Sequence, residues 1–415
     1  IAGPITTYGG NININGDLNT SSVTGGDILL KASGNIEQAA SKSIVTNGGN
    51  VVLWANSDNE STFGSVALRN GSSIITGSSS VTGGHVWIGG GSNGATWNGL
   101  SVGSGYAVPG NSFTPSNGGS ALRTAVYFER NSISTFGGNI KIAGNAPEYA
   151  YGIATYGNTI ELNSGNGTIE LDGEVTGNLA GTNRNGIVFG VHDVSIASTV
   201  NIKSSAASGD AITLNGVGRG TGDGIGLSGT VNLTASGGGN IIMTGDAKGT
   251  GNGIVTGSYY HGKLNVFAST GDIKLNGGDK AIQVAAAVSN GSTSGPSKIT
   301  LGSGGTISSS TSDVFITADN ITLAAGGIEV NTSGELTLES SSPSFASALT
   351  FPITNSSLAN TISRLTLGKS TNTADVTIGA NTTIAGPITT YGGNININGD
   401  LNTAGANDAD ILLKA

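Results

Sequence analysis

Residue types that commonly perform catalysis are few in this sequence of 415 residues. Cysteine is absent, and the histidines lie far apart, with no His-x-x-x-His pair and no nucleophile-elbow motif. The carboxylates are dispersed, and the densest local group, Asp58 with Glu60, fits turn capping. We therefore predict no catalytic residue, no metal site and no cofactor. The three histidines, expected at solvated turns or strand surfaces, are His85, His192 and His261.

Aromatic side chains are the better candidates for contact with a ligand. Four of them directly follow the threonine of a recurrent Ile-x-Thr motif, so alternation along a strand turns them away from that threonine and outward. Two more lie in a glycine-rich segment. Outward rings can stack on sugars or pack against a neighbouring filament, and the alternative is that they cover the flank of the molecule or pack under a loop. The six candidates are Tyr8, Trp97, Tyr106, Phe136, Tyr156 and Tyr391.

The composition of the chain predicts β structure with many turns. Glycine accounts for 71 residues and charged residues for only 10%, and each glycine destabilises a helix by about 1 kcal/mol. The glycines have no three-residue period and there are only 8 prolines, which excludes collagen. An apolar content of 36% is too high for a disordered chain.

A long internal repeat defines the organisation of the chain. Residues 1–20, IAGPITTYGGNININGDLNT, recur unchanged at 384–403, and DILLKA at 27–32 recurs at 410–415. We interpret residues 1–383 as one repeat unit and residues 384–415 as the start of the next copy. We expect a longer parent protein built as a tandem array, in which the start of one unit caps the open end of the unit before it.

A shorter pattern, Ile-x-Thr-x-Gly, recurs within the unit and is often followed by Gly-Asn and an alternating strand, as at residues 5–14. Short strands separated by Gly and Asn turns, repeating about every 16 to 23 residues, predict a solenoid. The fold class we predict is all-β, a right-handed parallel β-helix with stacked Ile, Val and Leu inside and a ladder of threonine hydroxyls at a corner. About twenty coils, each rising about 4.8 Å, would make the unit roughly 90–100 Å long.

Two stretches interrupt this rhythm. The segment at about 89–130 begins with a loop-like, glycine-rich run, which we expect to leave the stack of coils. Residues 335–367 contain no glycine, and Leu358, Ile362 and Leu365 have a spacing that one short helix would use. The alternative for this second stretch is continued strands, since LTLG at 365–368 resembles the next strand.

Charge and hydropathy restrict the partners. The net charge is −9 and no basic block is present, so we expect no nucleic-acid binding. No apolar run is long enough for a membrane-spanning helix, so we expect no membrane insertion. Without cysteine, stability must come from repeated packing rather than from disulfides.

Several strings of the sequence resemble the coils of filamentous-haemagglutinin-type exoproteins, which are bacterial surface proteins secreted by the two-partner route. Examples are ITTYGGNININGDLNT, SIVTNGGNVVLWAN and GDILLKASGNI. The likeness covers most of the chain outside 89–130 and 335–367 and depends on the recurrent Gly-Gly-Asn-Ile/Val pattern. It implies a right-handed parallel β-helix, secretion to the bacterial cell surface or extracellular matrix, and a role in adhesion, aggregation or biofilm.

The function we expect is therefore that of a structural and adhesive repeat module. Its expected partners are neighbouring repeat copies joined end to end, together with other filaments, cell-surface glycans or a polysaccharide matrix. The first alternative is a β-helical polysaccharide lyase or hydrolase, which needs carboxylates clustered along one groove. The second is an ice-binding β-helix, which needs a regular outward Thr-x-Thr array, whereas the motif threonine is expected to point inward.

Overall fold

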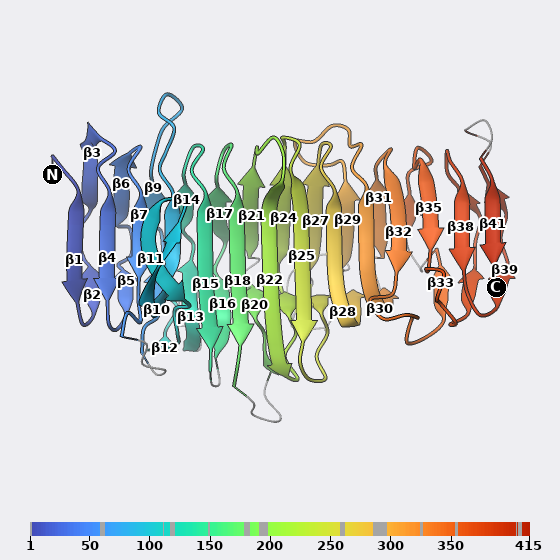
Figure 1. Cartoon of the computed structure of the whole chain (residues 1–415), viewed down its shortest axis with the longest axis horizontal. Coiled ribbons are helices and arrows are strands. Elements are labelled where there is room, and N and C mark those ends of the chain that lie inside the picture. The colour runs from blue at the N-terminus through green and yellow to red at the C-terminus, as the bar shows by residue number, and fades with distance from the viewer. Residues whose placement is uncertain are drawn as a thin grey trace.

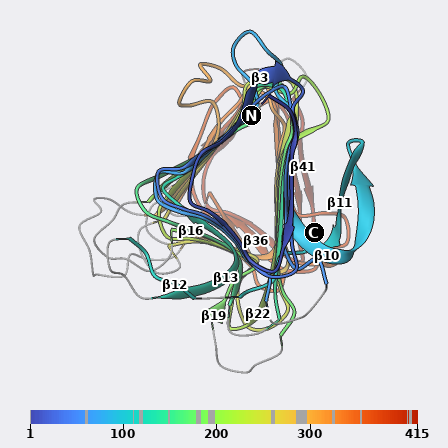
Figure 2. The same cartoon turned by 90° about the vertical axis from the view of Figure 1, so that its left-hand side faces the viewer.

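The computed structural model of the chain describes residues 2–58, 63–110, 112–116, 121–147, 150–177, 183–190, 198–257, 262–284, 297–323, 327–352, 356–403, 405 and 409–415. These residues form strands, turns and irregular segments and contain no helix. The strands stack along one axis into an elongated body with a triangular cross-section (Figures 1 and 2). The protein is a parallel β-helix, as the sequence predicts.

The coils contribute strands to three parallel rows, called here the first, second and third sheet in chain order, and long strands that run from the first into the second join these two. In the described part of the chain, the first sheet contains β1 (Ile5–Gly9), β4 (Ile28–Ala32), β7 (Val51–Trp54), β10 (Val86–Trp97), β15 (Ile140–Ala146), β18 (Ile169–Val175), β22 (Asp210–Gly220), β25 (Asn240–Ala247), β28 (Ile273–Val284), β30 (Val314–Leu323), β32 (Glu335–Glu339), β35 (Arg364–Leu367), β38 (Ile388–Tyr391) and β41 (Ile411–Lys414).

The second sheet includes the C-terminal halves of β28 and β30, and the same side of the coils then carries a separate three-stranded sheet. Its other strands are β2 (Ile12–Ile14), β5 (Ile36–Gln38), β8 (Val66–Leu68), β13 (Leu122–Glu129), β16 (Tyr151–Tyr156), β20 (Ile187–Phe189), β23 (Ile225–Leu227) and β26 (Ile254–Thr256). The separate sheet contains β33 (Leu349–Phe351), β36 (Val376–Ile378) and β39 (Ile395–Ile397).

The third sheet is followed by a separate pair of strands. The sheet contains β3 (Leu18–Thr24), β6 (Ser43–Asn47), β9 (Ser73–Ile75), β14 (Ser132–Ser134), β17 (Thr159–Asn163), β21 (Thr199–Ser204), β24 (Thr230–Ala235), β27 (Lys263–Ala268), β29 (Lys298–Gly302), β31 (Ile328–Asn331) and β34 (Ser357–Leu358). The pair is β37 (Thr382–Thr383) with β40 (Leu401–Asn402). Other strands lie outside the coils or add to their edges, namely β11 (Leu100–Gly105), β12 (Ser112–Phe113) and β19 (Asn183–Arg184).

The helix is right-handed. With the N-terminal end toward the viewer, the chain runs down the first sheet on the right, crosses to the second sheet at the lower left and returns upward to β3 (Figure 2). This clockwise path recedes from the viewer, in agreement with the general chirality of parallel β crossovers.

Stacked aliphatic side chains fill the interior. On the first sheet, one inward position is occupied by Ile, Val or Leu in every coil from Ile28 to Ile388, and each of these side chains is at most 1% exposed. Burying such a side chain contributes roughly 1.5–3 kcal/mol, so the ladder is a main source of stability. Its members are Ile28, Val51, Val86, Ile140, Ile169, Ile212, Ile241, Ile273, Val314, Leu336, Leu365 and Ile388.

The predicted hydroxyl ladder lies at the corner between the third and first sheets. Thr46 Oγ1 donates to the Gly49 carbonyl at 2.5 Å, and Thr76 Oγ1 donates to the Gly84 carbonyl at 2.6 Å. Glycine is required there because a methyl group on Gly84 would overlap the Gly49 carbonyl oxygen of the coil before it. Equivalent hydroxyl bonds are made by Thr20, Thr135 and Ser164 to Gly26, Gly138 and Gly167.

The expected coil number and rod length are wrong. On the first sheet, the shortest step between neighbouring coils runs from Val314 to Leu336, and the longest runs from Val86 to Ile140. Only twelve coils therefore separate Ile5 from Ile388, which is about 58 Å at about 4.8 Å per coil. The Ile-x-Thr motif occurs on different sheets, so its recurrence does not mark one coil.

The two irregular stretches differ from each other. Within 89–130, β11 and β12 lie outside the stack, whereas β13 is an ordinary coil strand that pairs with β8 and β16. In the glycine-free stretch 335–367, the short helix is wrong. The segment contains β32, β33, β34 and β35, and Ile362 follows a turn between β34 and β35. The apolar spacing there therefore reflects inward positions on two strands and the turn that joins them.

The internal repeat resumes the stack in the same register. Ile5 pairs with Ile28 and Tyr8 with Lys31 in β1 and β4. The equivalent pairs of the second copy are Ile388 with Ile411 and Tyr391 with Lys414, in β38 and β41. The second copy therefore enters the solenoid with the same pairing as the first.

Candidate functional site

A β-hairpin stands over the first sheet near its N-terminal end. The strand β10 pairs with β15 as far as Ile88 and with β7 as far as Gly89, leaves the sheet, and returns antiparallel as β11. Its tight turn, Asn98 and Gly99, has φ values of 46° and 79°, the conformation that favours Asn-Gly in hairpins. Figure 2 shows the hairpin projecting from one side of the triangular body.

The hairpin covers a cluster of tryptophans. Trp54 is 5% exposed and Trp87 is 2% exposed, and both pack with Val52 and Val102. The indole nitrogen of Trp54 donates to the Gly91 carbonyl at 2.7 Å, which ties the hairpin to the sheet. Trp97 is half-buried against the same cluster. These are the three tryptophans of the whole sequence.

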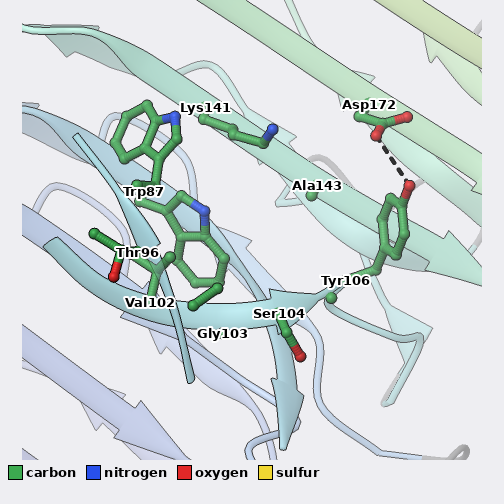
Figure 3. Close-up of a pocket in the computed structure, with 12 residues that line it drawn as sticks. Trp87, Thr96, Val102, Gly103, Ser104, Tyr106, Lys141, Ala143 and Asp172 are labelled. Atoms are coloured by element: carbon green, nitrogen blue, oxygen red, sulfur yellow. Dashed lines mark hydrogen bonds between the residues drawn. The ribbon is translucent and has the colours of Figure 1, made fainter. Parts of the chain in front are cut away.

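A pocket of about 250 Å³ lies between the hairpin and the sheet. Its apolar lining comes from Trp87, Trp97 and Val102, and its polar lining includes Thr96, Ser104, Tyr106, Lys141 and Asp172. Figure 3 shows Lys141 extending from the sheet beside the indole of Trp87, and Tyr106 directed at Asp172. The pocket therefore combines aromatic walls with a few convergent polar groups, as ligand sites commonly do.

Hydrogen bonds fix the polar side of this pocket. Tyr106 Oη donates to Asp172 Oδ2 at 2.9 Å, and Lys141 Nζ donates to Glu170 Oε1 at 2.8 Å. Burial raises the pKa of the Asp172 carboxyl, and the bond from Tyr106 opposes that shift. Burial and the nearby Asp172 carboxylate raise the pKa of the Tyr106 phenol. The phenol therefore stays protonated and acts as the donor.

Three carboxylates alternate along β18 next to the pocket. Glu170, Asp172 and Glu174 occupy the outward positions, while Ile169 and Leu171 point into the core. The Glu174 carboxylate accepts a long hydrogen bond of 3.5 Å from Asn145. Three negative groups against the single ammonium of Lys141 make this part of the sheet unfavourable for anions.

The predicted contact aromatics fall into different places. Trp97 and Tyr106 are brought together in the pocket. Tyr8 is 70% exposed and Phe136 is 43% exposed, both outside it. Tyr391 is half-buried, with the Lys414 ammonium 5.6 Å from its ring centre. These residues do not form one surface site.

Tyr156 requires a correction. Its side chain points away from the main core, as alternation predicts, but it is only 2% exposed. It packs in a second cluster on the outside of the second sheet, together with Phe113, Tyr127 and Tyr151. At this exposure Tyr156 offers almost no surface to a ligand, and its role is packing in the cluster.

His85 is part of a polar ladder rather than a solvated turn. At the start of the first sheet, a side-chain acceptor in each coil receives a backbone N–H from the next, and the series is Asp27, Asn50, His85 and Asn139. His85 Nδ1 accepts from the Asn139 N–H at 2.9 Å. Burial lowers the pKa of this imidazole, so the neutral ring is favoured. His192 and His261 lie outside the described residues.

Sequence reasoning did not select Trp87, Lys141 or Asp172. One readable signal was the segment 169–175, IELDGEV, whose alternation places Glu170, Asp172 and Glu174 on one face. The contact of Asp172 with Tyr106 had no comparable signal, because the two residues are far apart in the sequence.

The described residues include no group of three or more His, Asp or Glu side chains that could hold a metal ion. The same part of the chain contains no helix of the length and apolarity needed to cross a membrane. No protein-family model, curated protein or solved structure matches the chain.

Proposed function

We propose that the chain is one repeat of a long β-helical rod, part of a secreted protein of the bacterial surface or extracellular matrix that serves in adhesion, aggregation or biofilm. The observation that carries this proposal is the register of the internal repeat. The copy that starts at residue 384 pairs Ile388 with Ile411 as the first copy pairs Ile5 with Ile28. A solenoid that repeats both sequence and register can be extended without a change of geometry.

Burial of apolar surface favours such extension. Ile28 and Leu30 are covered by neighbouring coils and are 0% and 1% exposed, whereas their repeats, Ile411 and Leu413, are 43% and 39% exposed. A further coil in the same register would cover both side chains and would satisfy the strand edge of β41. End-to-end stacking is therefore the arrangement that we propose for successive copies.

The surface and the resemblance to filamentous-haemagglutinin-type proteins support the adhesive part of the proposal. With 10% charged residues and abundant Asn, Ser and Thr, the outer faces are mostly polar and uncharged. Such faces can pack on glycans or on like rods without strong charge repulsion. An ice-binding role has less support, because the motif threonines Thr46, Thr135 and Thr390 are buried.

A glycan-degrading enzyme is the second candidate, favoured by the carboxylate row of β18. Two carboxylates across a glycosidic bond are the usual machinery of glycoside hydrolases. Two contacts argue against this role. Glu170 forms an ion pair with Lys141, and Asp172 Oδ2 accepts a hydrogen bond from Tyr106 Oη, so it is engaged as an acceptor and not as a general acid. We therefore favour the structural and adhesive role.

A chain with two repeats tests the rod. Residues 1–415 followed by a second segment 33–415 should form one particle that is longer by about 58 Å than the single chain, with unchanged width, in small-angle scattering and electron micrographs. A control with a flexible Gly/Ser linker between the copies should give two jointed bodies. If the chain without the linker also gives two jointed bodies, the proposal is wrong.

A further inference from the structure

The hairpin pocket has the features of a ligand site that the rod itself does not need. A simple spacer requires only coils, yet β10 leaves the first sheet after Gly89 and β11 returns to enclose space against it. Gly103 fits only because it has no side chain, since a methyl group there would overlap the Gly90 carbonyl and lie 2.7 Å from Trp54 Nε1. The hairpin is therefore held closely at its base while the pocket stays open beside it.

We propose that this pocket binds an uncharged saccharide. A sugar ring has an apolar face of C–H groups and a rim of hydroxyls, and the pocket presents both complements. The half-buried indole of Trp97 and the wall formed by Trp87 and Val102 suit the apolar face. The Asp172 carboxylate and the Lys141 ammonium lie on the polar side and can accept from and donate to hydroxyl groups.

The charge of the pocket selects against acidic sugars. Glu170, Asp172 and Glu174 occupy one strand, and the ammonium of Lys141 is already engaged by Glu170 at 2.8 Å. A uronate or sulfate group would meet a local excess of negative charge, which lowers affinity for the wrong partner. A neutral hexose or N-acetylhexosamine meets no such penalty.

The size of the pocket predicts weak binding at a single site. Its volume of about 250 Å³ is below the roughly 300–1,000 Å³ of sites for drug-sized ligands, so it holds one or two rings of a longer chain. Weak sites gain strength when many are linked. The gain from linked sites rests on the proposed rod, whereas binding of a saccharide by a single unit does not. Failure of the rod proposal and failure of the pocket proposal can therefore be distinguished.

Intrinsic fluorescence gives a direct test, because all three tryptophans of the chain lie at the hairpin. Titration of the full chain with cellohexaose, chitohexaose or isomaltohexaose should change tryptophan emission and saturate for at least one of them. A hyaluronan hexasaccharide, which is anionic, should bind at least tenfold more weakly. If none of the three neutral probes binds, or if hyaluronan binds more tightly, the proposal is overturned.

Variants locate the site. By calorimetry, Trp97→Ala should weaken binding of the neutral probe at least tenfold, about 1.4 kcal/mol, and Asp172→Asn several-fold. Tyr8→Ala is the matched control, because Tyr8 is an exposed aromatic outside the pocket, and it should bind like the unmodified chain. Equal loss in Tyr8→Ala, or no loss in Trp97→Ala with an unchanged circular dichroism spectrum, would place the ligand elsewhere and overturn the proposal.

The same mixtures distinguish binding from catalysis. The neutral hexasaccharide should be recovered intact after prolonged incubation. Release of shorter sugars that disappears in Glu170→Gln and Asp172→Asn would overturn the binding proposal in favour of the enzyme.

Discussion

Segments that leave the coils cover aromatic residues on two outer faces of the body. One face keeps an open pocket, and on the other the aromatic residues are sealed. Over the first sheet, the hairpin of β10 and β11 leaves a pocket of about 250 Å³ beside Trp97. Over the second sheet, β12 brings Phe113 into stacked contact with Tyr127, with ring centres 5.3 Å apart. Figure 2 shows the hairpin and β12 on different sides of the triangular body.

The difference shows that outward direction alone does not make an aromatic residue a ligand contact. Tyr156 and Trp97 are both outside the main core, but Tyr156 is sealed under a local cluster while Trp97 borders open space. How closely the covering segment packs determines whether the aromatic residues beneath it form a buried cluster or line a ligand pocket. We expect mutations of the sealed cluster to change stability and mutations of the hairpin pocket to change binding.

The largest expected effect is on the sealed cluster. Tyr127 is 0% exposed, and Tyr127→Ala should lower the free energy of unfolding by about 3–5 kcal/mol, as large aromatic truncations in cores do. The measurement is urea unfolding followed by circular dichroism. Trp97→Ala is the counterpart on the open face and should cost about 1 kcal/mol or less, since Trp97 is only half-buried. Equal losses for the two variants would abolish the distinction between the faces.

A smaller loss is expected when the hairpin base is disturbed. Gly103→Ala places a methyl group against the Gly90 carbonyl, and such overpacking typically costs about 1–3 kcal/mol. The tryptophan emission should shift to longer wavelength as the tryptophan cluster beneath the hairpin becomes exposed to water. Gly94→Ala is the matched control on the same hairpin, because nothing lies within 4 Å of its added methyl. A shift of equal size in both variants would show that the close fit of Gly103 is unimportant.

Acid should weaken the ladder next to the hairpin. Burial lowers the pKa of His85, so the folded state binds a proton less readily than the unfolded chain. Stability from this group is therefore complete above the ordinary histidine pKa of about 6.5 and falls as the pH drops below it. His85→Asn restores the residue type of Asn50 and Asn139 in this ladder. The melting temperature of His85→Asn should fall less on acidification than that of the unmodified chain. An equal fall in the two proteins would contradict this role.

The smallest stability effect is expected at Asp172. Burial raises the pKa of its carboxyl, so the ionised form destabilises the fold at neutral pH, and this penalty disappears as the pH falls and the group is protonated. Asp172→Asn should therefore melt at the same or a slightly higher temperature at neutral pH while binding sugar more weakly. A gain in stability with a loss of binding is typical of a functional residue. A clear loss of stability at neutral pH would indicate a structural role instead.

The sequence predicts the coil architecture well because each strand carries its own local signal. The alternation at Ile12, Asn13 and Ile14 appears in the structure as buried, exposed and buried residues. The corner glycines Gly49 and Gly84 accept the hydroxyl bonds of Thr46 and Thr76. The number of coils was predicted wrongly because the Ile-x-Thr motif fits any of the three sheets. Ile5 lies on the first sheet, Ile153 on the second and Ile133 on the third.

The pocket was predictable only in part. Trp97 and Tyr106 stood out because they are aromatic residues in a glycine-rich segment, and that segment forms the hairpin. Their partners come from later coils, since Lys141 lies on β15 and Asp172 on β18. Which coil a hairpin covers depends on how many residues the intervening coils contain, and the coils differ widely in length. No local pattern encodes that distance.

A crystal structure of the chain grown with the tightest-binding neutral hexasaccharide tests the central contrast most directly. We predict sugar density in the hairpin pocket, with one ring against Trp97 and hydroxyl groups within hydrogen-bond distance of Asp172, and none on the aromatic cluster of the second sheet. Sugar bound at Tyr8, Phe136 or Tyr391 with an empty hairpin pocket would contradict the account.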